Sequence, residues 1–343
     1  MIRLPAGGHG ASQAKRSRPF GPSRLLGSAV AALSLTAGSA WAEDLTVVAT
    51  IKPVHALVAQ VMGDAGEPKL LVGGTASPHT YSLKPSDAKA LNNARLIFRV
   101  SEDIEPFTRK IVAALPKSVT VITLAGAPEL TLLDKRSGNT FEAHEHGGTH
   151  DHHDHDHDDG NGDPHQGEAK GPVRDGHIWL DPRNGVAMVR EITRALSEVA
   201  PDKKATFEAN AAAAVASIEA AAREIDAELA SVKNKPFVVF HDAYQYFEER
   251  FNVPAAGAIT ISPEVQPSAK RLGEIRRKIK ELDVACVFAE PQFKSKLVAT
   301  VVEGTGAKAG TLDPEGASIE AGPGAYVALL KNLAQSLKGC LTS

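Results

Sequence analysis

Short runs rich in Val, Ile, Leu or Phe alternate with amphipathic stretches of ten or more residues from Leu45 onward. This alternation is typical of the strands and helices of a parallel α/β sheet. The runs predict two sets of four strands, at 45–50, 69–72, 94–100 and 119–124, and at 237–240, 255–261, 285–289 and 307–312. We expect helices to begin near Pro53, Pro85, Glu102, Tyr244, Ser268, Phe293 and Ala325.

The two sets of predicted strands share a weak internal repeat. A Ser-Pro pair followed by a Pro-Ser pair occurs at 77–78 and 85–86 in the first half, and at 262–263 and 267–268 in the second. The length of 343 residues is also about twice that of a common domain. The sequence therefore predicts two related α/β lobes.

A long segment without internal Gly or Pro lies between the two predicted lobes, from Pro201 to Pro236. Its spacing of apolar residues predicts one helix of about 45 Å over residues 201–234, which would act as a stiff link. Two shorter helices with a break are the alternative. The apolar residues recur every three or four positions, at Phe207, Ala211, Val215, Ile218, Ala222, Ile225, Leu229 and Val232.

The N-terminal residues have the pattern of a secretory signal peptide. The first 24 positions hold basic but no acidic residues, the apolar run 25–40 follows, and Ala40-Trp41-Ala42 forms a cleavage motif. We predict cleavage after Ala42 and export to the periplasm of a bacterium. An uncleaved membrane anchor is the alternative, which the shortness of the apolar run disfavours.

The composition is ordinary for a soluble globular protein. Hydrophobic residues make up 43% and charged residues 23% of the chain, which argues against a disordered or multi-span membrane protein. The formal net charge of −3 is too small to indicate nucleic-acid binding. In an oxidising compartment the two cysteines, Cys286 and Cys340, either pair or remain two free thiols.

Histidine has an unusual distribution along the chain. Because the tract that holds most of the histidines is interleaved with acids and has no apolar run to bury, we expect it to be a mobile loop. Imidazole binds zinc, copper and nickel, so the tract predicts several low-affinity metal sites. A solvated polar insert without a metal role is the alternative. The tract holds eight of the 13 histidines, at His144, His146, His150, His152, His153, His155, His157 and His165.

Isolated side chains elsewhere are candidates for a more specific metal site. His241 and Asp313 end predicted strands, and ligands bind at the carboxyl ends of parallel strands. His79 lies in a turn-rich segment, and His177 follows the His-rich tract. One such histidine alone is more often structural, whereas the four side chains together indicate one metal site between the lobes.

Six segments in order along the chain carry a family resemblance. They read TIKPVHALV from Thr50, SPHTYSLKPSD from Ser77, HIWLDP from His177, FHDAYQYF from Phe240, FAEPQF from Phe288 and LDP from Leu312. Together they resemble the ZnuA family, the periplasmic zinc-binding proteins of zinc-uptake ABC transporters. The His-rich tract also lies where zinc-type members carry theirs.

This resemblance implies a cluster A-I solute-binding protein: an α/β fold of two Rossmann-like lobes, each with a four-stranded parallel sheet, joined by one long rigid helix. By motif, His79, His177 and His241 match the three histidine ligands, and Asp313 matches the carboxylate near the fourth position. Pro78 stands where some zinc-type relatives carry a ligand Glu, so the fourth ligand is Asp313 or water. Manganese-type relatives carry Glu in place of His241, so the resemblance implies Zn²⁺.

The same resemblance implies that Cys286 and Cys340 form a disulfide, and that His55, which matches no ligand position, is structural. These features divide the chain into successive parts. The parts are a signal peptide (1–42), the first lobe (43–135), the His/Asp-rich loop (136–172), the end of the first lobe (173–200), the linking helix (201–234) and the second lobe (235–343).

The leading hypothesis is a monomeric binding protein without enzymatic activity. It would capture Zn²⁺ in the periplasm and deliver it to the transmembrane permease of an inner-membrane ABC transporter. A periplasmic zinc buffer or metallochaperone is one alternative. A zinc hydrolase is another, because three histidines with an open fourth position also activate water. The chain has neither the HExxH nor the GxSxG motif of common hydrolases.

Overall fold

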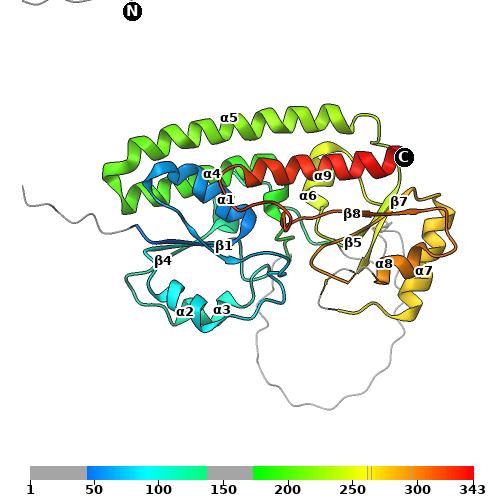
Figure 1. Cartoon of the computed structure of the whole chain (residues 1–343), viewed down its shortest axis with the longest axis horizontal. Coiled ribbons are helices and arrows are strands. Elements are labelled where there is room, and N and C mark those ends of the chain that lie inside the picture. The colour runs from blue at the N-terminus through cyan, green and yellow to red at the C-terminus, as the bar shows by residue number, and fades with distance from the viewer. Residues whose placement is uncertain (1–44, 137–172, 261, 264, 295) are drawn as a thin grey trace, which may run out of the picture. The chain divides into compact units, whose positions relative to one another are not determined.

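A computed structural model describes residues 45–136 and 173–343, except positions 261, 264 and 295 (Figure 1). The predicted signal peptide with its cleavage site after Ala42 and the His-rich tract from His144 to His165 lie outside the described residues. Among the helices of the described part, none is long and apolar enough to cross a lipid bilayer.

Two four-stranded parallel sheets with the same strand order form the framework. The central strands β1 and β5 are buried at every position, as is typical of parallel sheets covered on both faces. All eight predicted strands are confirmed, and the repeated order supports the relationship between the two halves. The first sheet, β2-β1-β3-β4, contains β1 (Val47–Ile51), β2 (Lys69–Val72), β3 (Leu96–Arg99) and β4 (Thr120–Thr123), and the second, β6-β5-β7-β8, contains β5 (Phe237–His241), β6 (Gly257–Thr260), β7 (Cys286–Ala289) and β8 (Lys308–Thr311).

Helices alternate with the strands in both halves. Pro85 begins α2, and the side chains of Asp181 and Ser268 cap the first turns of α4 and α7. The helices around the first sheet are α1 (Lys52–Met62), α2 (Pro85–Asn92), α3 (Thr108–Ala113) and α4 (Pro182–Val199), and those around the second are α6 (Gln245–Phe251), α7 (Ala269–Glu281), α8 (Lys296–Val302) and α9 (Ala325–Thr342).

Three helices differ from the sequence prediction. α3 begins at Thr108 rather than near Glu102, because Pro106 disfavours helical geometry at the residue before it. α8 begins at Lys296 rather than near Phe293. α4 was not predicted, although Asp181 and Pro182 form a capped helix start of the kind that identified α2.

The predicted linking segment contains one unbroken helix, α5 (Lys204–Leu229), after a 3₁₀ turn at Pro201–Lys203. Its 26 residues span about 39 Å at the usual helical rise. This is shorter than predicted because turns replace the helix before Pro236, where a helical residue is disfavoured. α5 packs on α1, α4 and α9 (Figure 1). The two-helix alternative is therefore wrong, and the stiffness of the link stays a prediction.

The C-terminal helix α9 joins the second sheet to helices of the first half. It packs on α1 and α5, and a disulfide connects its Cys340 to Cys286 at the start of β7, with the two Cα atoms 6.2 Å apart. The disulfide implied by the family resemblance is thus present, and the alternative of two free thiols is wrong. This crosslink holds α9 against β7, an inner strand of the second sheet.

Loss of the disulfide is expected to lower the free energy of unfolding by about 2–4 kcal/mol, because the crosslink restricts the unfolded chain. Its two cysteines are separated by 54 positions. Urea unfolding with and without dithiothreitol measures the effect. As a control, unfolding of the Cys340→Ser variant should not respond to the reductant. Equal midpoints for the oxidised and reduced wild-type protein would contradict the prediction.

Candidate metal centre

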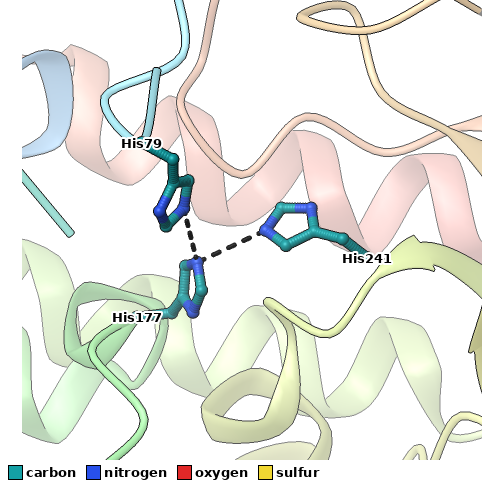
Figure 2. A group of neighbouring side chains, drawn as sticks. All are labelled: His79, His177 and His241. Carbon is teal, nitrogen blue, oxygen red and sulfur yellow. Dashed lines mark hydrogen bonds between the residues drawn. The ribbon is translucent and has the colours of Figure 1, made fainter. Parts of the chain in front are cut away.

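Three histidine side chains that lie far apart in the sequence meet at one point (Figure 2). His79 comes from the turn-rich segment after β2, His177 from the residue before the 3₁₀ turn Ile178–Leu180, and His241 from the last position of β5. Nε2 of His177 lies 3.3 Å from Nε2 of His79 and 3.4 Å from Nε2 of His241. The structure therefore brings together three of the four predicted pocket residues.

The spacing of these nitrogens fits a tetrahedral zinc site. With Zn–N bonds of about 2.0–2.1 Å, two ligand nitrogens at adjacent corners of a tetrahedron are about 3.3–3.4 Å apart. The two measured Nε2–Nε2 distances fall at this value. Two of the three pairs of ring nitrogens therefore have the spacing of ligands of one zinc ion, and the ligand atoms of all three rings lie within 4.8 Å of one another.

Two of the three rings form hydrogen bonds to carboxylates through Nδ1, the nitrogen that does not belong to the Nε2 group. Nδ1–H of His177 donates to Oδ1 of Asp175 at 2.7 Å, and Nδ1–H of His241 donates to the carboxylate oxygens of Glu290 at 2.7 and 2.8 Å. In the neutral ring this tautomer leaves the lone pair on Nε2. The lone pairs of His177 and His241 thus point toward the same position, which favours a cation there.

The second sheet explains how His241 and Glu290 come to face each other. β5 and β7 are neighbours at the place where the strand order reverses direction, and ligands of open α/β sheets bind at such switch points. His241 is the last residue of β5, and Glu290 directly follows β7. The supporting roles of Asp175 and Glu290 were missed by the sequence analysis, although Glu290 lies in the FAEPQF motif and directly follows a predicted strand.

The position of His177 depends on the lack of a side chain at Gly176, the residue that precedes it. A Cβ added to Gly176 would lie 2.6 Å from Cγ1 of Ile104, which is closer than any real Cβ contact. A larger residue at this position would push the segment that carries His177 away from the first half. The ring of Trp179 lies next to that of His177, with centroids 5.3 Å apart.

The surroundings shift the pKa values of His79 and His241 in opposite directions. Burial, together with the two neighbouring histidines, lowers the pKa of His79 to about 2, so its ring is neutral at physiological pH. Burial also lowers the pKa of His241, but Glu290, with smaller contributions from Asp242 and Asp175, outweighs this and raises the pKa above its ordinary value. His241 is therefore a histidine at which protons compete with a metal ion.

Asp313, the fourth predicted pocket residue, is not part of the three-histidine group. Its Oδ1 accepts hydrogen bonds from Nε2 of Gln292 at 2.9 Å and from the backbone N–H of Glu315 at 3.2 Å. Its Oδ2 is buried and has no hydrogen-bond partner within the described part of the chain. A buried carboxylate oxygen without a donor suits a cation, and its role as fourth ligand stays a prediction.

The segment that carries Asp313 is fastened to the first half of the chain. The ammonium group of Lys52, in α1, donates to the backbone carbonyls of Gly316, Ala317 and Ile319 at 2.6–3.1 Å. Nε1 of Trp179 donates to the carbonyl of Pro314 at 2.8 Å. These bonds hold the residues around Asp313 beside the elements that carry His177.

His55 lies apart from the metal group, as predicted. It is buried in α1, and its Nε2 forms a hydrogen bond of 2.9 Å with the carbonyl of Pro68. That bond joins α1 to the residue before β2, which is a structural role.

The three histidines line a small cavity of about 80 Å³. Pockets for organic ligands usually measure several hundred Å³, so this space suits an ion and a few water molecules. Lys135 and Arg174, on either side of the segment 137–172, also line the cavity.

Comparisons with known proteins show the family of this chain. A family model described as the periplasmic component A of a zinc-uptake complex matches residues 47–340. The chain belongs to the ZnuA family. A high-affinity zinc uptake system protein ZnuA of Brucella suis is 48% identical over 305 residues, which cover 86% of this chain and 91% of that protein. The ZnuA protein of Paracoccus denitrificans is 38% identical over 91% of this chain and 96% of its own length.

A solved structure extends the similarity to the fold. The crystal structure of a ZnuA deletion mutant with zinc bound has a TM-score of 0.68 and 25% sequence identity, over 88% of this chain and 99% of that one. In the present protein, the imidazole nitrogens of His79, His177 and His241 provide a nitrogen-rich donor set. Such a set suits zinc better than manganese.

Replacement of Glu290 by Gln is expected to weaken zinc binding about 10- to 100-fold, because partners of metal-bound histidines affect affinity by this amount. The amide keeps the size of the side chain but removes the charge that orients His241. Titration calorimetry in competition with a chelator measures the change. Glu219→Gln, at an exposed position of α5, is the control. Equal affinity of the two variants would exclude this role of Glu290.

Zinc affinity is expected to fall as the pH drops, because a proton on Nε2 removes the lone pair that binds the metal. Since the pKa of His241 is raised, the loss should begin above pH 6.5 and continue at lower pH, whereas the pKa of His79 near 2 adds nothing in this range. Dissociation constants measured from pH 8 to pH 5 test this. His55→Gln should leave the pH profile unchanged, and a flat wild-type profile would refute the prediction.

Proposed function

We propose that this protein captures Zn²⁺ in the periplasm and delivers it to the transmembrane permease of an inner-membrane ABC transporter for import. The observation that carries the proposal is the group of three histidines whose ligand atoms lie within 4.8 Å of one another, with Nε2 of His177 at 3.3 and 3.4 Å from Nε2 of the other two. Two further facts support it. The matching family model describes a periplasmic component of a zinc-uptake complex, and the curated relatives are named as zinc uptake proteins.

The zinc ion is the cargo of the protein and takes part in no reaction. The cavity of about 80 Å³ leaves little room for an organic substrate beside the metal. With Asp313 as the fourth ligand, no coordination position stays open for an activated water, which zinc hydrolases require. The protein thus acts as a binding component without enzymatic activity.

The remaining parts of the proposal rest on the sequence. The signal peptide is cleaved after Ala42, and the mature protein works as a monomer. The tract from His144 to His165 collects zinc at low affinity and passes it to the three-histidine pocket.

A protein that lacks residues 137–172 should then bind one zinc ion tightly but support growth less well under severe zinc limitation.

Substitution of His177 by Ala is expected to weaken tight zinc binding more than about 100-fold, because losing a ligand costs more than losing its hydrogen-bond partner. Both proteins are compared without residues 137–172, so that calorimetry reports on the pocket alone. His55→Ala in the same background is the matched control, since His55 is a buried histidine outside the metal group. Tight binding by the His177→Ala variant would refute the site.

A cellular measurement distinguishes a role in zinc uptake from a role in zinc storage. Deletion of the gene should reduce the accumulation of radioactive zinc from zinc-poor medium, and the wild-type gene but not the His177→Ala variant should restore it. A zinc buffer or metallochaperone would instead leave the rate of accumulation unchanged and alter only the distribution of zinc inside the periplasm.

A further inference from the structure

Arg136 forms a buried ionic cluster next to the metal site. Its Nε lies 3.0 and 3.1 Å from the carboxylate oxygens of Asp242, and its Nη1 and Nη2 lie 2.9 and 3.1 Å from those of Glu248. Its Nη2 also donates to Oδ1 of Asp242. The carboxylate side chains are each 5% exposed and that of Arg136 is 19% exposed. One guanidinium group thus bridges two carboxylates that are almost fully removed from water.

One of these carboxylates directly follows a metal-site residue in the chain. Asp242 is adjacent to His241, at the point where β5 ends and the backbone turns. Glu248 lies in α6 and also accepts a hydrogen bond from the backbone N–H of Ala255 at 3.0 Å. Arg136 therefore fixes the end of β5 to α6, while Glu290 fixes the ring of His241.

The backbone around Arg136 is itself held in place. Residues 133–135 pair with residues 173–175 in a short antiparallel arrangement, in which Lys135 N–H donates to the carbonyl of Val173 at 2.8 Å and Asp175 N–H donates to that of Leu133 at 2.9 Å. We call these two segments the stem. The hydroxyl of Tyr246, in α6, bonds both stem segments, because it accepts from Leu133 N–H at 3.0 Å and donates to the carbonyl of Asp175 at 2.8 Å.

The stem therefore carries two supports of the metal site. Its second segment contains Asp175, which holds His177, and Arg136 directly follows its first segment and holds Asp242 beside His241. Asp175 lies in the paired backbone and Arg136 directly next to it, so the stem limits the distance between the two supports. The stem thus helps to fix the positions of His177 and His241, which come from distant parts of the chain, relative to each other.

We propose that Arg136 is a positioning residue for the zinc site: by binding Asp242 and Glu248 together, it fixes the backbone at the end of β5 from which His241 reaches the metal. This inference rests on the proposed zinc-binding function. A guanidinium group suits the role because its planar fork bonds two carboxylates at once. An ammonium group neutralises the same charge but cannot reproduce this geometry.

The Arg136→Lys variant tests the proposal, since it keeps the positive charge between the buried carboxylates. We expect zinc affinity to fall about 10-fold or more, as for other outer partners of metal ligands. Competition with a chelator measures the tight site of the full-length protein. Binding of Co²⁺ gives a second readout, because the intensity and position of its visible bands report ligand geometry. A merely structural Arg136 would leave this spectrum unchanged in the folded variant.

Arg194→Lys is the matched control. Arg194 also bridges two carboxylates, those of Glu191 and Glu198, at 2.6–2.9 Å, but on the outer surface of α4 and away from the histidines. The control should keep the wild-type zinc affinity and Co²⁺ spectrum. Circular dichroism of each metal-free variant establishes that the comparison concerns folded proteins.

A second pair of variants covers the case in which Arg136→Lys does not fold. Asp242→Asn should reproduce the loss of affinity and the altered Co²⁺ spectrum, whereas Glu248→Gln, which retains the bond between Arg136 and Asp242, should have a smaller effect. Wild-type affinity and spectrum in a folded Arg136→Lys variant, or in Asp242→Asn, would overturn the inference alone. Failure of the wild-type protein to bind zinc tightly would overturn the proposed function as well.

Discussion

The whole site depends on the requirement that three nitrogen lone pairs point to one position. An imidazole ring can rotate and can carry its proton on either nitrogen, so proximity alone does not make a ligand set. Hydrogen bonds from Nδ1 to Asp175 and Glu290 remove both freedoms for His177 and His241. The distances of 3.3 and 3.4 Å from Nε2 of His177 to Nε2 of His79 and of His241 match those between neighbouring ligands of a zinc ion.

The fold serves this requirement by bringing distant segments to one place. His79 and His177 are 98 positions apart, and His177 and His241 are 64 positions apart. The duplicated sheet places His241 and Glu290 at a switch point of the second half. Lys52 and Trp179 fasten the segment around Asp313 to the first half, and the stem fixes Asp175 and Arg136 relative to each other. Backbone carbonyls and stem contacts, rather than the histidines themselves, therefore hold the segments together.

Much of this arrangement could be predicted from the sequence, for local reasons. The strands are short runs of buried apolar residues, and the three histidines stand at strand ends or in turns with few competing candidates. The supporting residues could not be found in this way, because Asp, Glu and Arg are common and their partners are remote. Glu290 is 49 positions from His241, and Arg136 is 106 positions from Asp242. No periodicity connects such pairs, and only the folded backbone shows which of many charged residues meet.

The helix α4 was missed for a different reason. It follows the segment 137–172, and the alternation of strands and helices that identified the other elements is interrupted there. Its cap at Asp181 and its proline at the first position were local signals that agreed with a helix. Interpretation of the chain by alternation alone thus fails where an insert separates an element from the strand before it.

The two carboxylates that bond Nδ1 of His177 and His241 also contribute to the net charge around the metal position. Asp175 and Glu290 are both nearly inaccessible to water, and three neutral imidazoles add no charge to theirs. A cation among the histidines offsets the charge of this buried pair, and a doubly charged ion offsets more of it than a singly charged one, which matters because an uncompensated buried charge is costly. Two residues that bond only the Nδ1 side of the rings thus add electrostatic attraction for a divalent cation to that of the nitrogen donors.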